Sequence, residues 1–136
     1  MLISFAKTTD AVIMDRKRKT RRNWTMVHAK KFRQGQVVDF WSKSPRVYGL
    51  NMGTIVLDRG PYRENTRLLK DPEDFIAEGF EYMTEAGLKM GGMEPLIFFH
   101  KWKAEAITLY VVEFHLNDLT EAGQERKREL EALDDN

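Results

Sequence analysis

The chain has 136 residues, of which 42% are hydrophobic, enough for one domain around one core. No segment approaches the ~18 consecutive apolar residues that a membrane helix needs, so we expect no membrane partner. The absence of cysteine excludes disulfides and thiolate chemistry, and the opening segment Met1–Phe5 is too short for a signal-peptide core. Together these features predict a cytoplasmic protein.

The formal net charge of +1 conceals two halves of opposite sign. Residues 1–70 contain 16 basic and 5 acidic residues, whereas residues 71–136 contain 6 basic and 16 acidic residues. Such an asymmetry is typical of a protein with a basic face for a polyanion. The alternative is that the two halves pack against each other and pair their charges.

The first half of the chain predicts short strands separated by short helices. Residues 36–41 and 52–57 are rich in β-branched and aromatic residues, which favour strands. The other elements expected here are a strand at residues 2–5, a helix capped by Thr8 or Thr9 and ending at Met14, and one helical turn at residues 27–32.

The second half predicts more helix. The expected elements are a polar linker at residues 64–71, helices at residues 72–77 and 82–89, and a strong strand at residues 107–115. Residues 95–103 fit a helix or a strand, because a short apolar run does not distinguish the two. We expect one domain over residues 1–116 and an acidic tail over residues 117–136, helical or frayed. This order of elements predicts an α+β fold with a small closed or half-closed sheet.

The segment Arg16–Arg22 concentrates positive charge, since six of its seven residues are basic and the seventh is Thr20. A threonine hydroxyl becomes a nucleophile when a neighbouring base takes its proton, and Lys17 is a candidate base if it is neutral. Like charges around Lys17 disfavour its ammonium form and lower its pKa. In a regular strand residues 17 and 20 point to opposite faces, so the pair meets only if the chain turns between them. The alternative is a solvated or phosphate-binding surface without chemistry.

Other polar and aromatic residues suggest binding rather than catalysis. Trp24 follows the basic segment and either stacks on a base or packs in the core. The three histidines share no metal-ligand spacing, so we expect no metal site and no cofactor. The candidate residues for binding nucleic acid or substrate are Arg16, Arg18, Arg21, Arg22 and Trp24.

Four segments follow one another in a recognisable order: Arg16–Arg22, Gly35-Gln36-Val37-Val38-Asp39, Ala77-Glu78-Gly79-Phe80 and Tyr110-Val111-Val112-Glu113-Phe114. Their order and spacing resemble the ASCH domain, a family in the PUA-like superfamily. The resemblance covers residues 1–116, and in its motif the chain resembles a small bacterial branch that acts as an N(4)-acetylcytidine amidohydrolase.

The resemblance implies a PUA-like small β-barrel with short flanking helices, and RNA or a modified nucleoside as the partner. By motif it assigns Lys17 as base, Thr20 as nucleophile and Glu78 as proton donor in the hydrolysis of an acyl amide on a nucleoside. Three residues depart from the family pattern, which has glycine, threonine and a small apolar residue at these positions: Asp15, Arg18 and Lys19. The alternative function is a non-catalytic RNA-binding module that uses the same basic cleft.

Overall fold

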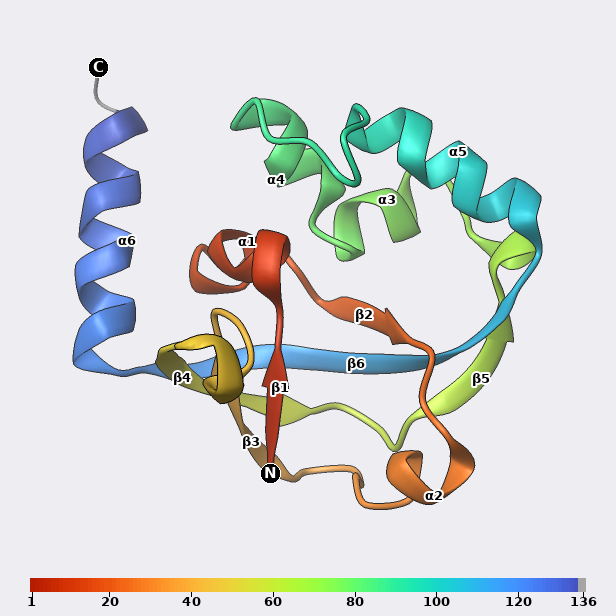
Figure 1. Ribbon diagram of the computed structural model, residues 1–136, viewed down its shortest axis with the longest axis horizontal. Coiled ribbons are helices and arrows are strands. Elements are labelled where there is room, and N and C mark those ends of the chain that lie inside the picture. The colour runs from red at the N-terminus through yellow and green to blue at the C-terminus, as the bar shows by residue number, and fades with distance from the viewer. Residues whose placement is uncertain (135–136) are drawn as a thin grey trace.

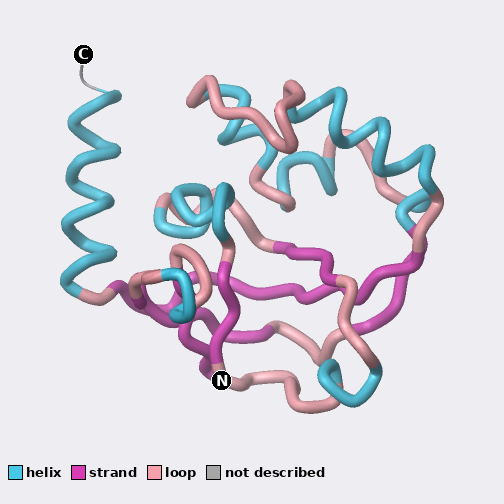
Figure 2. Tube along the Cα trace, in the orientation of Figure 1, coloured by secondary structure: helices cyan, strands magenta, loops and turns pink. Residues whose placement is uncertain are grey.

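The computed structural model describes residues 1–134 as an α+β fold built on one curled, six-stranded mixed sheet that forms a half-barrel (Figure 1). In Figure 2 the strands occupy the lower part of the view, and helices α3, α4 and α5 group above them. The strands are β1 (Leu2–Ser4), β2 (Lys19–Arg22), β3 (Val37–Trp41), β4 (Asn51–Leu57), β5 (Tyr62–Asn65) and β6 (Thr108–Leu119). The α-helices are α1 (Thr9–Ile13), α2 (Met26–Ala29), α3 (Glu73–Ala77), α4 (Phe80–Glu85), α5 (Pro95–Glu105) and α6 (Glu121–Asp134), and short 3-10 helices are η1 (Ala6–Thr8), η2 (Pro45–Val47) and η3 (Thr66–Leu68).

The long strand β6 organises the sheet. The strand order is β1-β3-β4-β6-β2, and β5 also pairs with β6. Only β1 and β3 run parallel among the pairs in the described part of the chain. Register shifts occur at Phe40/Trp41 and at Thr54/Ile55, and such irregularities bend strands and increase their twist, which fits the curled shape.

The structure confirms the strands predicted at residues 36–41, 52–57 and 107–115, which are β3, β4 and β6 of one sheet. It assigns the ambiguous run at residues 95–103 to helix α5. The predicted polar linker at residues 64–71 is wrong in its first part, because Glu64 and Asn65 pair with β6 as the end of β5.

Strand β6 continues beyond residue 116, and the acidic tail after it forms a helix rather than a frayed end through residue 134. Residues 135–136 of the predicted tail lie outside the described residues. Helix α6 packs against β4 and α1, with Leu130 buried. Gly123 permits this close packing, because a Cβ atom there would lie 2.0 Å from the backbone oxygen of Met52.

The structure contains two hydrophobic clusters. The larger lies between the sheet and α1 and includes Phe5, Phe40 and Phe114. The smaller lies among α3, α4 and α5 and includes Phe80 and Phe99. No helix within residues 1–134 combines the length and the apolar character needed to cross a membrane.

Candidate active site

A cavity of about 530 Å³ lies between the start of the chain, β2 and the helical group α3–α5. A volume of this size falls in the range typical of small-molecule sites. The cavity brings together the three residues that the resemblance assigned to catalysis, Lys17, Thr20 and Glu78. Its apolar wall is mostly aromatic and comes from Phe80, Phe98 and Trp102.

Lys17 is buried, and its ammonium group is held by Glu78. Lys17 Nζ donates to the backbone oxygen of Glu78 at 2.6 Å and to Oε1 of its carboxylate at 3.3 Å. The pKa of Lys17 is lowered to about 8, mainly by burial; Glu78 opposes the shift, and the nearby charges of Arg22 and Arg21 add to it. The sequence-based argument named the right direction but the wrong main cause. Burial outweighs the like charges because it removes the ammonium from water.

The chain turns sharply at Gly79, which allows Glu78 and Lys17 to approach. Gly79 has φ +86°, in the left-handed region, and it directly precedes α4. A Cβ atom at this position would lie 2.9 Å from Ala11 Cβ and 3.2 Å from Lys17 Cβ. A larger residue at position 79 would therefore be strained and would push Lys17 away from Glu78.

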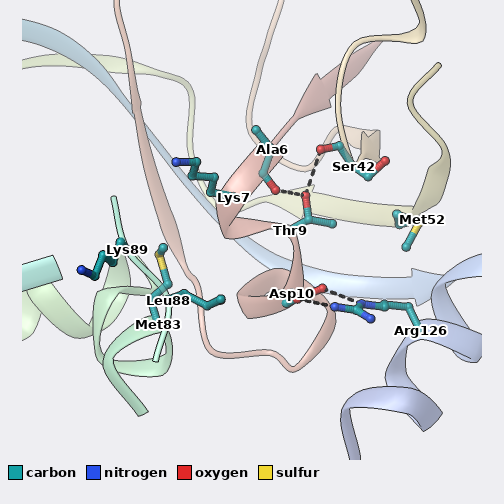
Figure 3. A pocket seen from close by; sticks show the side chains of 10 residues that line it. All are labelled: Ala6, Lys7, Thr9, Asp10, Ser42, Met52, Met83, Leu88, Lys89 and Arg126. Carbon is teal, nitrogen blue, oxygen red and sulfur yellow. Dashed lines mark hydrogen bonds and ion pairs between the residues drawn. The ribbon is translucent and has the colours of Figure 1, made fainter. Parts of the chain in front are cut away.

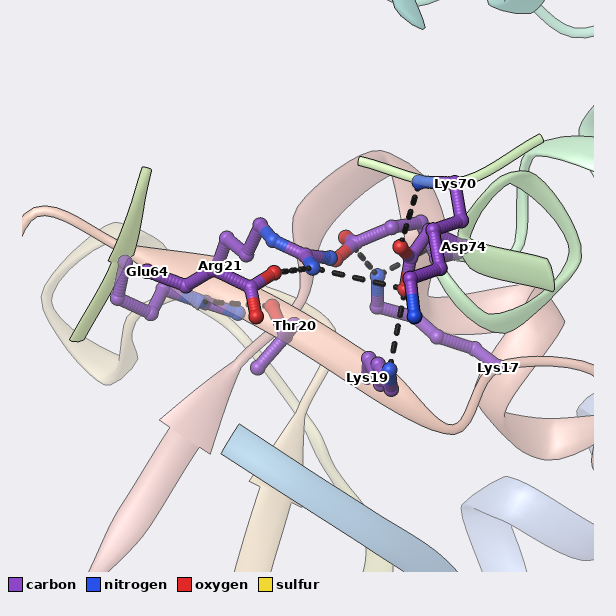
Figure 4. Close-up of polar contacts among 9 residues, drawn as sticks. Lys17, Lys19, Thr20, Arg21, Glu64, Lys70 and Asp74 are labelled. Atoms are coloured by element: carbon purple, nitrogen blue, oxygen red, sulfur yellow. Dashed lines mark hydrogen bonds and ion pairs between the residues drawn. The ribbon is translucent and has the colours of Figure 1, made fainter. Parts of the chain in front are cut away.

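Arg21 holds the other side of the Glu78 carboxylate. Its Nη1 donates to Glu78 Oε2, and its Nη2 lies 2.8 Å from Glu64 Oε1 and 3.5 Å from Asp74 Oδ1. Lys19 Nζ also reaches Asp74 Oδ1, at 3.0 Å. Figure 4 shows Arg21 and Lys19 extending from β2 towards these carboxylates. Glu78 thus lies between two buried cations.

Glu64 and Asp74 belong to this cluster although the sequence analysis did not select them. Glu64 is on β5, and Asp74 is buried in the first turn of α3, where its Oδ2 accepts a hydrogen bond from the backbone N–H of Lys70 at 2.8 Å. The opposite charge of the two halves of the chain points only to the half that contains Asp74, and Glu64 lies in the basic half. That feature identifies no single carboxylate.

Thr20 is buried in the same cavity, and its hydroxyl contacts Arg22 rather than Lys17. Thr20 Oγ1 accepts from Arg22 Nε at 3.0 Å, and within residues 1–134 no hydrogen bond joins it to Lys17 Nζ. Strand β2 begins only at Lys19, and the backbone N–H of Arg18 donates to Ala77 O at 2.7 Å. The chain is therefore not a regular strand between residues 17 and 20, and the opposite-face restriction does not apply.

Arg22 lies against the wall of the cavity formed by the start of the chain. Its Nη2 donates to the backbone oxygen of Ser4 at 2.7 Å, and its guanidinium lies 5.2 Å from the centre of the Phe5 ring. Burial lowers the pKa of Arg22, against the attraction of Glu78. No carboxylate in the described part of the chain forms an ion pair with Arg22.

The remaining predicted binding residues do not line this cavity. Arg16 pairs with Glu81 at 3.0 Å and with Glu85 at 2.9 Å, and Arg18 pairs with Asp15 at 3.1 Å. The Trp24 ring is stacked on Phe32, with ring centres 4.7 Å apart and planes 11° apart. Most basic residues of the segment Arg16–Arg22 therefore form ion pairs with carboxylates of the second half of the chain.

Among residues 1–134, no group of three or more His, Asp and Glu side chains is placed to hold a metal ion. The polar side chains that line the cavity include a lysine, a threonine, a carboxylate and two guanidinium groups. No family model matches the chain, and no curated protein or solved structure matches it either.

Proposed function

We propose that the protein is a hydrolase that cleaves an acyl amide on a modified nucleoside. The main support for this proposal is that Lys17, Thr20 and Glu78 line one cavity and that the pKa of Lys17 is lowered to about 8. A lysine with such a pKa is partly neutral near pH 8, so it is able to accept a proton. The aromatic wall of the cavity suits a flat base.

In this mechanism Lys17 takes the proton from Thr20, and the threonine oxygen attacks the amide carbonyl. Thr20 Oγ1 accepts a hydrogen bond from Arg22, which leaves its own hydrogen available for donation. Substrate binding must bring Lys17 Nζ and Thr20 Oγ1 together, as catalytic hydrogen bonds often tighten only in the complex. The guanidinium of Arg22 supplies positive charge close to the developing oxyanion.

The proton then travels to the leaving nitrogen. Lys17 Nζ lies 3.3 Å from Glu78 Oε1, so the proton taken from Thr20 passes to Glu78 and from there to the amine. Cleavage of the carbon–nitrogen bond leaves an acyl ester on Thr20. Water hydrolyses this ester, releases the carboxylic acid and restores the hydroxyl.

The resemblance to the ASCH domain supports the same assignment from an independent direction. Its motifs place a lysine, a threonine and a glutamate at the three positions that line the cavity. We propose on the same grounds that the half-barrel is of the PUA-like type.

The test is hydrolysis of a panel of acylated nucleosides that includes N(4)-acetylcytidine. Lys17→Ala, Thr20→Ala and Glu78→Ala should each lower turnover ~10²–10⁴-fold. Their effects should not add in combination, because the three residues act as one unit. Thr84→Ala is the matched control, since Thr84 is exposed, does not line the cavity, and its hydroxyl donates to Phe80 O of the same helix.

The alternative proposal is a non-catalytic RNA-binding module in which the same cavity receives an unpaired base. The aromatic wall supports it, because base stacking on aromatic side chains needs no chemistry. Binding of single-stranded RNA by wild-type protein, together with no turnover of any acylated nucleoside, would replace the hydrolase with this module.

A further inference from the structure

The positive charges of the cavity are not all matched by carboxylates. Lys17 and Arg21 share Glu78, whereas Arg22 and Lys7 also line the cavity and form no ion pair with any carboxylate of residues 1–134. Lys7 is exposed, which places it at the mouth. The site therefore presents excess positive charge to whatever enters it, and this favours an anionic ligand.

A second cavity of about 490 Å³ adjoins the first, and Ala6 and Lys7 line both. Lys89, from the loop between α4 and α5, also lines the second cavity. The carboxylate that lines this second cavity, Asp10, already forms an ion pair: its oxygens accept from Arg126 Nε at 3.0 Å and from Arg126 Nη2 at 2.9 Å. In Figure 3 the ammonium groups of Lys7 and Lys89 both point away from this ion pair.

Lys89, like Lys7, is exposed and has no ion-pair partner in the described chain. The two lysines come from segments far apart in the sequence, yet they line the same cavity. The rest of that cavity includes the apolar side chains of Met52, Met83 and Leu88, which offer no competing charge. Lysine ammonium groups bind phosphate as point charges from several directions, so a fixed planar geometry is not required.

We propose that the substrate is a nucleotide rather than a free nucleoside, with its phosphate monoester bound between Lys7 and Lys89 while its acylated base lies in the Lys17 cavity. The part of this inference that concerns the base rests on the proposed hydrolase. The shared position of Lys7 explains how one ligand engages both cavities. The phosphate is carried on the 5′ or the 3′ oxygen of the ribose, and the two are separate arms of the test.

The experiment compares kcat/KM for N(4)-acetylcytidine, its 5′-monophosphate and its 3′-monophosphate at low salt. Wild-type protein should prefer one monophosphate over the nucleoside by about tenfold, the value of one good charge-assisted contact. Lys7→Ala and Lys89→Ala should each reduce this ratio, and the double variant should bring it close to one. Lys31→Ala, an exposed lysine that lines neither cavity, should keep the wild-type ratio. A wild-type ratio near one for both monophosphates, or a preference that survives in the double variant, overturns the proposal.

A second measurement separates this inference from the hydrolase itself. Calorimetric titration of cytidine and of its two monophosphates into the Thr20→Ala protein reports binding without turnover. Tighter binding of a monophosphate that is lost in the Lys7→Ala, Lys89→Ala background supports the phosphate site even if no acylated compound is hydrolysed. Equal binding of cytidine and both monophosphates overturns it, whatever the outcome for hydrolysis.

Discussion

The half-barrel and the helical group α3–α5 have similar apolar interiors, but the contacts between them are of a different kind. Inside each, aromatic rings pack in an apolar core, with Phe40 and Phe114 in the half-barrel and Phe80 and Phe99 in the helical group. Across the boundary run ion pairs, from Lys17, Arg21 and Lys19 to the carboxylates of Glu78 and Asp74. The difference shows how a small protein keeps a polar cavity: charged side chains line the boundary that apolar packing would otherwise close.

The buried ion pairs of this boundary are expected to add little net stability. Removing two charges from water is costly, and a buried pair often gains little over apolar residues of the same volume. Removal of one partner is strongly destabilising, because the other charge is then left buried without compensation. Single substitutions in these ion pairs therefore test whether the boundary differs from the protein surface.

The largest effect is expected from Glu78→Ala. The side chains of Lys17 and Glu78 are each 3% exposed, so this substitution leaves Lys17 and Arg21 buried without their shared carboxylate. The free energy of unfolding should fall by about 3–5 kcal/mol, measured by urea denaturation. Glu81→Ala is the control: its pair with Arg16 has side-chain exposures of 36% and 43%, and such pairs contribute about 0–1 kcal/mol. Equal losses in the two variants would show that the boundary does not differ from an ordinary surface.

A smaller effect concerns the pH dependence of the site. With the pKa of Lys17 at about 8, the ammonium form predominates below pH 8 and cannot accept a proton. Turnover should therefore rise about tenfold per pH unit below this value and level off above it. Glu78→Gln removes the attraction that raises the pKa of Lys17, so the midpoint of the Lys17 titration, followed by NMR of its Cε, should move to lower pH. A midpoint that moves upward contradicts the assigned balance of burial and charge.

The smallest effect is expected for RNA binding. Each lost phosphate contact lowers the salt slope of binding by about one. Arg21 and Arg22 are largely enclosed by the boundary, so replacing both with alanine tests folding as well as binding. Arg18→Ala tests binding without a large effect on folding, because the Arg18 side chain is 52% exposed and pairs with Asp15 at the surface. Because Arg18 is already paired with Asp15, its replacement should leave the salt slope for single-stranded RNA nearly unchanged. A fall of about one would show that Arg18 contacts a phosphate and that the basic segment is a nucleic-acid face despite its ion pairs.

Parts of the site followed from short-range sequence features, and other parts did not. Lys17 and Thr20 were selected because they lie three residues apart in one basic segment, and both line the cavity. Glu78 was selected by resemblance alone, since several glutamates lie nearby in the sequence. Glu64 and Asp74 were missed, because nothing local to them distinguishes a carboxylate that meets Arg21 from one that faces water. Likewise, no local feature of the sequence indicates that Lys7 and Lys89 line one cavity.

The sequence by itself determined the strands β3, β4 and β6, because runs rich in β-branched and aromatic residues favour extended backbone. The opposite charges of the two halves were compatible with a basic face for a polyanion or with pairing between the halves, and the tertiary structure pairs most of the basic segment with carboxylates. Only the tertiary structure decided that residues 95–105 are a helix, since a short apolar run is compatible with either form until its neighbours are in place. Only the tertiary structure decided the burial of Lys17 as well. Its partner Glu78 lies 61 residues away in the sequence, and removal from water depends on segments that meet only in the folded chain.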